Sequence, residues 1–488
     1  MIRSKFILMF FMMAGLFLAC EKDDNEPDPV YEPEMLSFGF YVEDNPGVIL
    51  EDYVVEDIQD NRIMILMPAE VDRSELIARF TTTENAVVEV DGEVQVSGTT
   101  KNDFTVPVDY IVSEETENVK YTVMVGETPD FVWSSLPSYA GDDGKSLVMK
   151  VNPENNLPYF LYKQKRESTS DEGAGMLVFK DGDWESLGQV SDGRIGNYFD
   201  FTFDFEGNPY VSYADYTTDV SNMLSVKRQD GSSWNTVGEP GFTSDRFSYH
   251  SLSFVNEDVL MLAGTFDGRN GPLERRELAV NFYENGNWTI NQTIPGRPSD
   301  LVGYLVVTVR AGDAVYVGSY NAVNPNTISV HKYENNNWET IIDTWADPEA
   351  TSISLRSFDI AVDQNENVYV ALSDNSSDEE EKHRVIKYDA ETGEIENVGN
   401  HIIAAKGSYV NFSLAVSPFG VPFLAYRNES LFPTVVQLDP KTQDWTSPEV
   451  LESAEVNEMN IDFAANGVGY LSYVKDNVIV AHKFDAPE

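Results

Sequence analysis

The sequence contains very little cysteine, histidine or basic side chain. Cys20 is the only cysteine among 488 residues, so the chain can form no disulfide within itself. There are 33 Lys and Arg against 82 Asp and Glu, which gives a formal net charge of −49. Binding to nucleic acid relies on clustered basic side chains that release counterions from phosphates. This charge balance excludes general affinity for nucleic acid and broad adhesion to anionic membranes.

The short motifs of common catalytic and metal sites are also missing. We find no HExxH, no paired-cysteine zinc site, no GxSxG and no phosphate-binding glycine loop. The acidic run of residues 374–381 lacks the spacing of a calcium-binding EF-hand loop. A glycoside hydrolase needs a pair of carboxylates, and among so many acids no pair stands out. We therefore expect no cofactor and no bound metal.

The N-terminal residues predict export. Arg3 and Lys5 precede an apolar run over residues 6–19, which is shorter than the ~20 residues needed to cross a bilayer. Cys20 stands where this run ends, and an acidic stretch, EKDDNE, follows at once. We predict a cleaved signal peptide over residues 1–19. Residues 20–34, which carry three prolines and almost no apolar pattern, are predicted to form an acidic tether.

This segment resembles a bacterial lipoprotein signal, with Ala19 before the cysteine and Phe17 where the lipobox usually has leucine. Residues 20–24, CEKDD, resemble the export tag of Bacteroidetes surface lipoproteins. The resemblance implies lipidation of Cys20 and a surface-exposed position on the outer membrane. Contact with the membrane would then be through the lipid anchor only.

Residues 35–128 show short alternating strands. The clearest is a hairpin, VVEV-DG-EVQV, over residues 87–96, in which Asp91 and Gly92 form a turn that needs positive φ. The pattern resembles the cadherin-like or immunoglobulin-like β-sandwiches of bacterial surface proteins. Such modules are usually spacers, which is the role that the resemblance implies.

Residues 131–488 contain a repeat of about fifty residues. Six tryptophans share one local context, and Ile395 takes the place of a seventh; the slots are Trp133, Trp184, Trp234, Trp288, Trp338, Ile395 and Trp445. Successive slots are 51, 50, 54, 50, 57 and 50 residues apart. Each unit also carries two alternating strands around a tight Gly/Asn turn, as in FTFDFEGNPYVSY from Phe201. Four short strands per unit are typical of a β-propeller blade.

The ends of this region predict how a ring would close. The last unit stops after its third strand, VIVAHKF, and the missing tryptophan strand is found at residues 131–136. Pairing these two strands leaves no open edge. The predicted fold is therefore all-β, with an N-terminal β-sandwich followed by a seven-bladed β-propeller closed by its first strand and last blade. The repeat resembles the propellers of Bacteroidetes surface lipoproteins.

The loops between blades, and those between second and third strands, vary widely and share one face, so we expect a binding site there. Tyr198, Tyr249 and Tyr304 occupy the same aligned position in three consecutive units, and Tyr409 lies near it in another. A tyrosine at a channel mouth can stack on a sugar face and use its hydroxyl as donor or acceptor. The alternative is that these rings pack as wedges between blades.

Ten of the twelve arginines after residue 130 fall in loops assigned to this variable face. They are Arg166, Arg194, Arg246, Arg269, Arg275, Arg276, Arg297, Arg356, Arg384 and Arg427. Because a guanidinium pairs oxyanions with two hydrogen bonds, this bias suggests a site for a carboxylated or sulfated ligand. The alternative is that long loops simply hold more polar residues. From these we select Arg194, Arg246, Arg356 and Arg427 as ligand-binding candidates beside the four tyrosines.

One cluster would suit catalysis. Arg246, Tyr249 and His250 place a cation, a phenol and a base within five residues. Seven-bladed polysaccharide lyases use such residue types to remove the proton next to a uronate carboxylate. The alternative is that His250 is a packed histidine at the start of a strand.

The sequence favours recognition of an extracellular ligand, most plausibly a glycan, by a non-enzymatic surface lipoprotein. A propeller-type polysaccharide lyase or glycoside hydrolase is the second hypothesis. The third is a scaffold of an outer-membrane complex, whose partner would be a surface protein.

Overall fold

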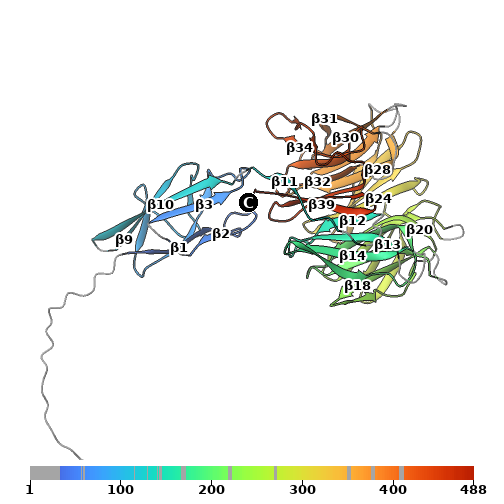
Figure 1. Cartoon of the computed structure of the whole chain (residues 1–488), viewed down its shortest axis with the longest axis horizontal. Coiled ribbons are helices and arrows are strands. Elements are labelled where there is room, and N and C mark those ends of the chain that lie inside the picture. Colours follow the sequence, from blue (N-terminus) through green and yellow to red (C-terminus); the bar gives the residue numbers. More distant parts are fainter. Residues whose placement is uncertain are drawn as a thin grey trace, which may run out of the picture. The chain divides into compact units, whose positions relative to one another are not determined.

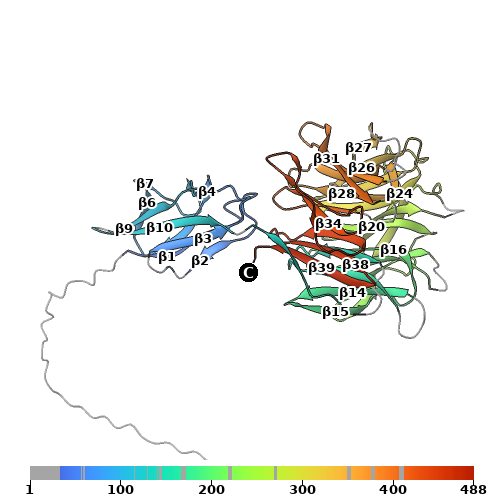
Figure 2. The ribbon, with the colours of Figure 1, turned by 45° about the horizontal axis from the view of Figure 1, so that its top comes forward.

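The computed structural model describes residues 33–487 except 57, 59–60, 115, 129, 140, 142–145, 166–171, 218–221, 244, 269–271, 349–352, 375–379 and 406–411. The predicted signal peptide, Cys20 and residues 21–32 of the tether lie outside this part of the chain, as do Arg166, Arg269 and Tyr409. Every regular element within it is a β-strand, and no helix there could cross a membrane. The chain separates into two compact units, drawn in Figures 1 and 2 and described here one at a time.

Unit 1 consists of residues 33–40, Tyr53–Ile65 and Arg73–Val125. Its strands are β1 (Met35–Phe40), β2 (Tyr53–Val55), β3 (Arg62–Met67), β4 (Leu76–Ile77), β5 (Arg79–Thr82), β6 (Val87–Val90), β7 (Glu93–Val94), β8 (Lys101–Asn102), β9 (Val108–Glu114) and β10 (Glu117–Glu127). They form a three-stranded sheet, β2-β1-β5, a five-stranded sheet, β3-β10-β9-β6-β7, and the pair β4-β8.

An aromatic core joins the two larger sheets of unit 1. Phe38 of β1 contacts Tyr110 of β9 edge to face, with 5.3 Å between ring centroids, and Phe104 lies 4.9 Å from Phe40. All four rings are buried. The expected hairpin is present, since β6 pairs with β7 and Asp91 and Gly92 have φ of 51° and 83°. The prediction of a positive-φ turn at Asp91-Gly92 is therefore confirmed.

Unit 2 contains residues 41–52, 66–72 and 126–487, and among its described residues seven antiparallel sheets follow one another. The first three are β12 (Leu147–Val151), β13 (Pro158–Lys165), β14 (Glu172–Lys180) and β15 (Asp183–Gln189); β16 (Ile195–Phe203), β17 (Pro209–Asp215), β18 (Met223–Asp230) and β19 (Ser233–Thr236); and β20 (Phe247–Asn256), β21 (Val259–Phe266), β22 (Leu278–Glu284) and β23 (Asn287–Gln292).

The fourth and fifth sheets are β24 (Gly303–Ala311), β25 (Ala314–Asn321), β26 (Thr327–Glu334) and β27 (Asn337–Trp345); and β28 (Ile353–Val362), β29 (Val368–Asp374), β30 (Glu380–Tyr388) and β31 (Ile395–Ala405). The sixth is β32 (Phe412–Val416), β33 (Pro422–Arg427) and β34 (Pro433–Asp439) with the short strands β35 (Asp444–Trp445) and β36 (Glu449–Val450). The seventh joins β37 (Asn457–Phe463), β38 (Gly469–Lys475), β39 (Val478–Asp485) and β11 (Val132–Ser135).

The same hairpin turn connects the first two strands of four sheets in unit 2. Its fourth residue after the strand has positive φ, at Gly207 (80°), Glu366 (63°), Gly420 (78°) and Gly467 (89°). In each turn the amide of this residue donates to the carbonyl three residues earlier, as Gly207 N does to Asp204 O at 3.0 Å. Glycine adopts this backbone at little cost, which explains the recurrent glycine of the repeat.

Each tryptophan slot lies on a strand at one edge of its sheet: β11, β15, β19, β23, β27, β31 or β35. From this strand the indole reaches back toward the sheet before it in the chain. Trp234 Nε1 donates to Leu187 O at 2.9 Å, and Trp288 Nε1 donates to Val237 O at 3.0 Å. At Trp234 and Trp288 the indole therefore joins neighbouring sheets through ring packing and one hydrogen bond, whereas Trp445 Nε1 is buried without a hydrogen-bond partner among the residues that the structure describes.

A second repeated contact joins the first strands of neighbouring sheets. In each case a side-chain oxygen on the first strand of one sheet accepts a hydrogen bond from a backbone N–H on the first strand of the neighbouring sheet. The pairs are Asp200 Oδ2 with Leu252 N (3.2 Å), Ser251 Oγ with Thr308 N (3.1 Å), Asp359 Oδ2 with Leu414 N (2.9 Å), Ser413 Oγ with Ile461 N (3.3 Å) and Asn460 Oδ1 with Met149 N (3.3 Å). These bonds fix the register between sheets.

The first and last strands of the repeat region, β11 and β39, pair with each other. β11 runs antiparallel to β39, with Val132 opposite Asp485 and Ser135 opposite His482. Both strands are labelled in Figure 1, the first in cyan and the second in red. The bond from Met149 N to Asn460 Oδ1 also connects β12 to β37. Sequence positions more than three hundred residues apart thus share one sheet.

Candidate functional site

Three tyrosines from three successive sheets lie together in unit 2. Tyr198 of β16, Tyr249 of β20 and Tyr304 of β24 all lie near the beginning of their strands. The rings of Tyr198 and Tyr249 are 4.3 Å apart between centroids, and those of Tyr249 and Tyr304 are 5.5 Å apart, both tilted by about 50°. Each side chain is half-buried. The rings therefore pack on one another while keeping part of their surface open to solvent.

Bulges at the beginning of the strands set the direction of these rings. In β20 the register shifts between Ser248 and His250, so that Tyr249 is the additional residue, with φ of 43°. In β24 the shift falls directly after Tyr304, and Leu305 has φ of 43°. A bulky residue at positive φ costs on the order of 1–3 kcal/mol and often marks a functional site. A bulge can also redirect a side chain beside such a site.

Arg276 completes this group. Its guanidinium carbon lies 5.2 Å from the Tyr249 ring centroid and 4.8 Å from that of Tyr304. The Arg276 backbone is held on both sides, because its N–H donates to Phe266 O at 2.6 Å and its carbonyl accepts from Gly303 N at 2.7 Å. We name Tyr198, Tyr249, Tyr304 and Arg276 the tyrosine cluster. Its cation is positioned by the fold before any ligand arrives.

Asp267 connects the tyrosine cluster to a second arginine. Its Oδ1 lies 3.3 Å from Arg276 Nε and 3.2 Å from Arg275 Nε, while its Oδ2 accepts from Ser248 Oγ at 3.4 Å. The side chain of Arg275 is 69% exposed, against 17% for Arg276. One carboxylate thus orients two guanidinium groups, one stacked on the rings and one facing solvent.

Arg194 and Arg246, two of the predicted ligand residues, are exposed at the same ends of the strands. Arg194 lies just before β16, with its guanidinium 5.0 Å from the centroid of the Tyr216 ring. Arg246 lies just before β20, and its carbonyl accepts from Asp267 N at 2.8 Å. Both arginines therefore lie on segments that lead into the tyrosine cluster.

Other predicted arginines have structural surroundings. Arg427, at the end of β33, is 3% exposed and donates to Val456 O and Asn457 Oδ1, both at 3.0 Å. Arg384 lies within β30 and forms a buried ion pair with Asp347, and Arg297 donates to Asn321 Oδ1 at 2.9 Å. Arg356 lies on β28, and its side chain, like that of Tyr409, is outside the description. Fewer of the ten arginines are therefore available to a ligand than the sequence pattern suggested.

His250, the predicted base, is placed inside the sheet. It is 5% exposed and lies opposite Gly264 of β21. Burial lowers its pKa to about 4, with a smaller opposing effect from the Asp200 charge, so the ring is neutral at pH 7. A general base must come within hydrogen-bond reach of the substrate. The neighbouring Tyr249 and Arg246 reach the surface, whereas the imidazole is enclosed.

No signal in the sequence singles out Arg276, which lies over two of the rings, or Asp267 beside it. Arg276 was one of ten loop arginines, with no signal to separate it from the others, because its partners come from β20, β21 and β24. Its positive φ of 68° also gives no signal in the sequence. In the part of the chain that the structure describes, no group of three or more His, Cys, Asp or Glu side chains could hold a metal ion.

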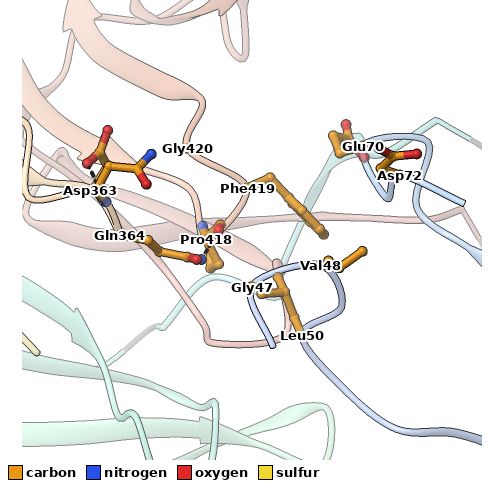
Figure 3. Close-up of a pocket in the computed structure, with 11 residues that line it drawn as sticks. Gly47, Val48, Leu50, Glu70, Asp72, Asp363, Gln364, Pro418, Phe419 and Gly420 are labelled. Carbon is orange, nitrogen blue, oxygen red and sulfur yellow. Dashed lines mark hydrogen bonds between the residues drawn. The ribbon is translucent and has the colours of Figure 1, made fainter. Parts of the chain in front are cut away.

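Unit 2 also has a pocket near the first hairpin turns, at the opposite ends of the strands from the tyrosine cluster. It is lined by Gly47, Val48, Leu50, Glu70, Asp72, Asp363, Gln364, Asn365, Pro418, Phe419 and Gly420 (Figure 3). Gln364 Nε2 donates to Pro418 O across its wall. The charged residues of its lining are all acidic, and none of the predicted site residues reaches it.

Residues 48–125 match the family described as SGBP, N-terminal, a domain of surface glycan-binding proteins of the Bacteroidetes type. The match covers 78 of the 488 residues. No curated protein matches the chain.

Among solved structures, an ulvan lyase of a polysaccharide lyase family, bound to -[GlcA(1-4)Rha3S]-, is similar with a TM-score of 0.50 and 10% identity, covering 71% of this chain and 95% of that one. An α-L-arabinanase from Penicillium chrysogenum has a TM-score of 0.40 at 10% identity, with 59% and 93% coverage. A Dyadobacter fermentans protein of unknown function has 0.41 at 9%, with 73% and 98%. The first of these shows the fold alone, and the other two are too distant to carry an argument. The chain is thus an all-β protein with a fold of the β-propeller kind.

Proposed function

We propose that this protein recognises an extracellular glycan through the tyrosine cluster and does so without chemical turnover. The observation that carries the proposal is the packing of three tyrosines from three sheets against one stacked arginine. Aromatic faces stack on the apolar face of a sugar ring, and phenol hydroxyls donate to or accept from its hydroxyl groups. The similarity of residues 48–125 to surface glycan-binding proteins supports the same function.

Binding is favoured over lyase chemistry by the position of the histidine. Tyr249 and Arg246 are accessible, but His250 is enclosed between strands and neutral. A lyase would also need a base that reaches the carbon next to the carboxylate. The partly exposed residues of the tyrosine cluster are suited to stacking and to hydrogen bonding. These interactions bind an intact sugar and supply no base for its cleavage.

The architecture that presents this site is proposed as a ring of seven blades over residues 131–488. The pairing of β11 with β39 and the bond between β37 and β12 support closure of the ring. The domain before it, residues 35–128, is proposed as an immunoglobulin-like or cadherin-like spacer. Its two sheets around a shared aromatic core support that role.

Attachment to the outer membrane is proposed to depend on lipidation of Cys20, after removal of residues 1–19. The acidic tether of residues 20–34 would then separate the folded domains from the lipid layer. Cys20→Ala should release the protein from the membrane fraction into the soluble fraction of the cells. A variant that still sediments with membranes would contradict lipid anchoring.

Glycan binding is tested with matched tyrosine variants. Tyr304→Ala removes one ring of the tyrosine cluster, whereas Tyr210→Ala removes a tyrosine that carries Arg228 on its ring at the opposite ends of the strands. Retardation in gels that contain neutral, uronate-containing or sulfated polysaccharides measures affinity, and ultraviolet absorbance of unsaturated products measures lyase activity. Since a stacked ring contributes about 1 kcal/mol, Tyr304→Ala should weaken binding by about fivefold and Tyr210→Ala should leave it unchanged.

Three outcomes would contradict the proposal. Equal losses in both variants would show that the tyrosine cluster is structural packing. Unsaturated products would show an enzyme, and no interaction with any polysaccharide would favour a surface protein as partner.

A further inference from the structure

We propose that the tyrosine cluster and Arg275 recognise an oxyanion on a sugar, a carboxylate or a sulfate, so that the ligand is an anionic polysaccharide. This inference rests on the proposed glycan-binding function and names the chemical class of the ligand. It begins from four cations, Arg194, Arg246, Arg275 and Arg276, around the cluster of a protein whose net charge is −49.

The stacked arginine can bind the sugar ring and its charge together. A guanidinium that lies over an aromatic face leaves the N–H groups at its edge in the plane, where they pair with two oxygens of one anion. Arg276 lies over both Tyr249 and Tyr304, at 5.2 Å and 4.8 Å. Arg276 Nε faces Asp267 and Nη1 is buried, so the carboxylate or sulfate of a sugar stacked beside these rings would meet this guanidinium at Nη2.

Asp267 positions Arg275 and Arg276 and neutralises only one of their two positive charges. Its Oδ1 faces the Nε atoms of both Arg275 and Arg276, at 3.2 Å and 3.3 Å. Because one carboxylate neutralises only one of two guanidinium groups, the group of three keeps a net charge of +1. The remaining N–H groups of Arg275 point into solvent on a side chain that is 69% exposed. Asp267 thus acts as a positioning residue, and Arg275 as the cation that a ligand meets first.

The backbone also prepares the site for an anion. Hydrogen bonds at 2.6 Å and 2.7 Å fix Arg276 between the end of β21 and the start of β24. The amide of Asp267 donates to Arg246 O at 2.8 Å, so the segment before β20 is held to the same loop. A cation held in place loses little conformational entropy on binding, and this increases its contribution to affinity.

Two of the acidic residues nearby, Glu277 and Asp245, have partners of their own. Glu277 is buried, and its Oε2 accepts from Glu274 N at 2.9 Å, while its charge acts on Arg297. Asp245 Oδ1 accepts from Arg246 N at 2.7 Å. These acids are committed to the loop backbone or to a structural arginine, so they leave the exposed face of Arg275 open to an anion.

The test uses ligands that differ only in charge. Binding of the purified chain is compared between polygalacturonate and its methyl ester, and between a sulfated galactan and its desulfated form. We expect the charged member of at least one pair to bind at least tenfold more tightly, because hydrogen bonds to charged groups contribute more than neutral ones. The first pair reports a carboxylate and the second a sulfate. Added salt should reduce this preference.

Variants assign the effect to the arginines. Arg275→Gln should lose the preference for the charged ligand while keeping affinity for the neutral one. The double variant Arg275→Gln/Arg276→Gln should lose this preference and also bind the neutral ligand more weakly, because Arg276 packs on two rings of the tyrosine cluster. Arg228→Gln is the matched control, because Arg228 also pairs with an aspartate, Asp204, and stacks on a tyrosine, Tyr210, but at the opposite ends of the strands. Arg275 is exposed, so its variant remains informative if the double variant fails to fold.

Equal affinity for the charged and uncharged members of both pairs would overturn the inference, as would full charge preference in Arg275→Gln. If the neutral ligands bind and Tyr304→Ala weakens that binding by about fivefold, the glycan-binding function stands and only the anionic preference falls. If no polysaccharide binds, both proposals fail.

Discussion

Replacing Ser251 with alanine should loosen the contact between three neighbouring sheets of unit 2. Ser251 Oγ donates to Asp200 Oδ2 at 2.6 Å on one side. On the other side it accepts from Thr308 N at 3.1 Å and lies 2.9 Å from Thr308 Oγ1. A single hydroxyl therefore connects β16, β20 and β24, the strands that carry the tyrosine cluster.

The magnitude follows from these partners. Losing a hydrogen bond to the charged Asp200 costs about 1.5–3 kcal/mol, and leaving the buried N–H of Thr308 without a partner costs about 1–3 kcal/mol. A water molecule in the space of the lost hydroxyl would recover part of this. We expect the free energy of unfolding to fall by about 3 kcal/mol. Ser253→Ala is the matched control, because Ser253 is equally buried two residues further along β20 and takes no part in this network.

Urea unfolding followed by tryptophan fluorescence measures both variants, since every sheet of unit 2 except that of β28–β31 carries a slot tryptophan. Ser251→Ala should shift the transition to lower urea and Ser253→Ala should change the free energy of unfolding by less than about 1 kcal/mol. Equal midpoints for the two variants would refute the reasoning that side-chain to backbone bonds hold the first strands together.

Three further changes test other contacts. Trp234→Phe keeps a ring but removes the bond from Nε1 to Leu187 O, so unfolding should become easier by about 1 kcal/mol; an unchanged urea midpoint would contradict the role of the indole. Leu136→Pro removes the N–H that donates to Ala481 O at 2.9 Å, so the melting temperature should fall if β11 completes the last sheet. Burial raises the pKa of Asp359 to about 6, so the folded state holds this proton more tightly than the unfolded state does. The stability that comes from this proton is fully present below the ordinary pKa of an aspartate and is lost as the pH rises through 6. Asp359→Asn should therefore gain about 2–3 kcal/mol relative to the wild type between pH 4 and pH 7, and a difference independent of pH would exclude this titration.

Much of the secondary structure could be predicted because its signals are local. The Asp91-Gly92 turn has the expected positive φ, and all seven slots of the tryptophan repeat lie on strands at one edge of a sheet. Glycine at Gly207, Gly420 and Gly467 marks turns whose backbone favours that residue. Such features depend on a few neighbouring residues, so a pattern of residue types is enough to predict them.

The candidate site could be predicted only in part. The aligned position of Tyr198, Tyr249 and Tyr304 was visible in the repeat, and their rings lie in contact. The burial of His250 and Arg427 was not visible: His250 follows two partly exposed residues in β20, and β33, which ends at Arg427, is buried along its whole length. Exposure there depends on bulges and on the packing of the neighbouring sheet, which a sequence pattern does not specify.

The sequence by itself determined the period of the repeat, the turns and the acidic charge of this protein, because each depends on residue type and spacing along the chain. Only the tertiary structure decided that Arg276, out of ten loop arginines, lies over two tyrosine rings with Asp267 beside it. The physical reason is that this contact joins a loop after β21 to the bulged beginnings of β20 and β24. Its geometry is fixed by the packing between sheets and by a left-handed backbone at Arg276, which no local preference of arginine would predict.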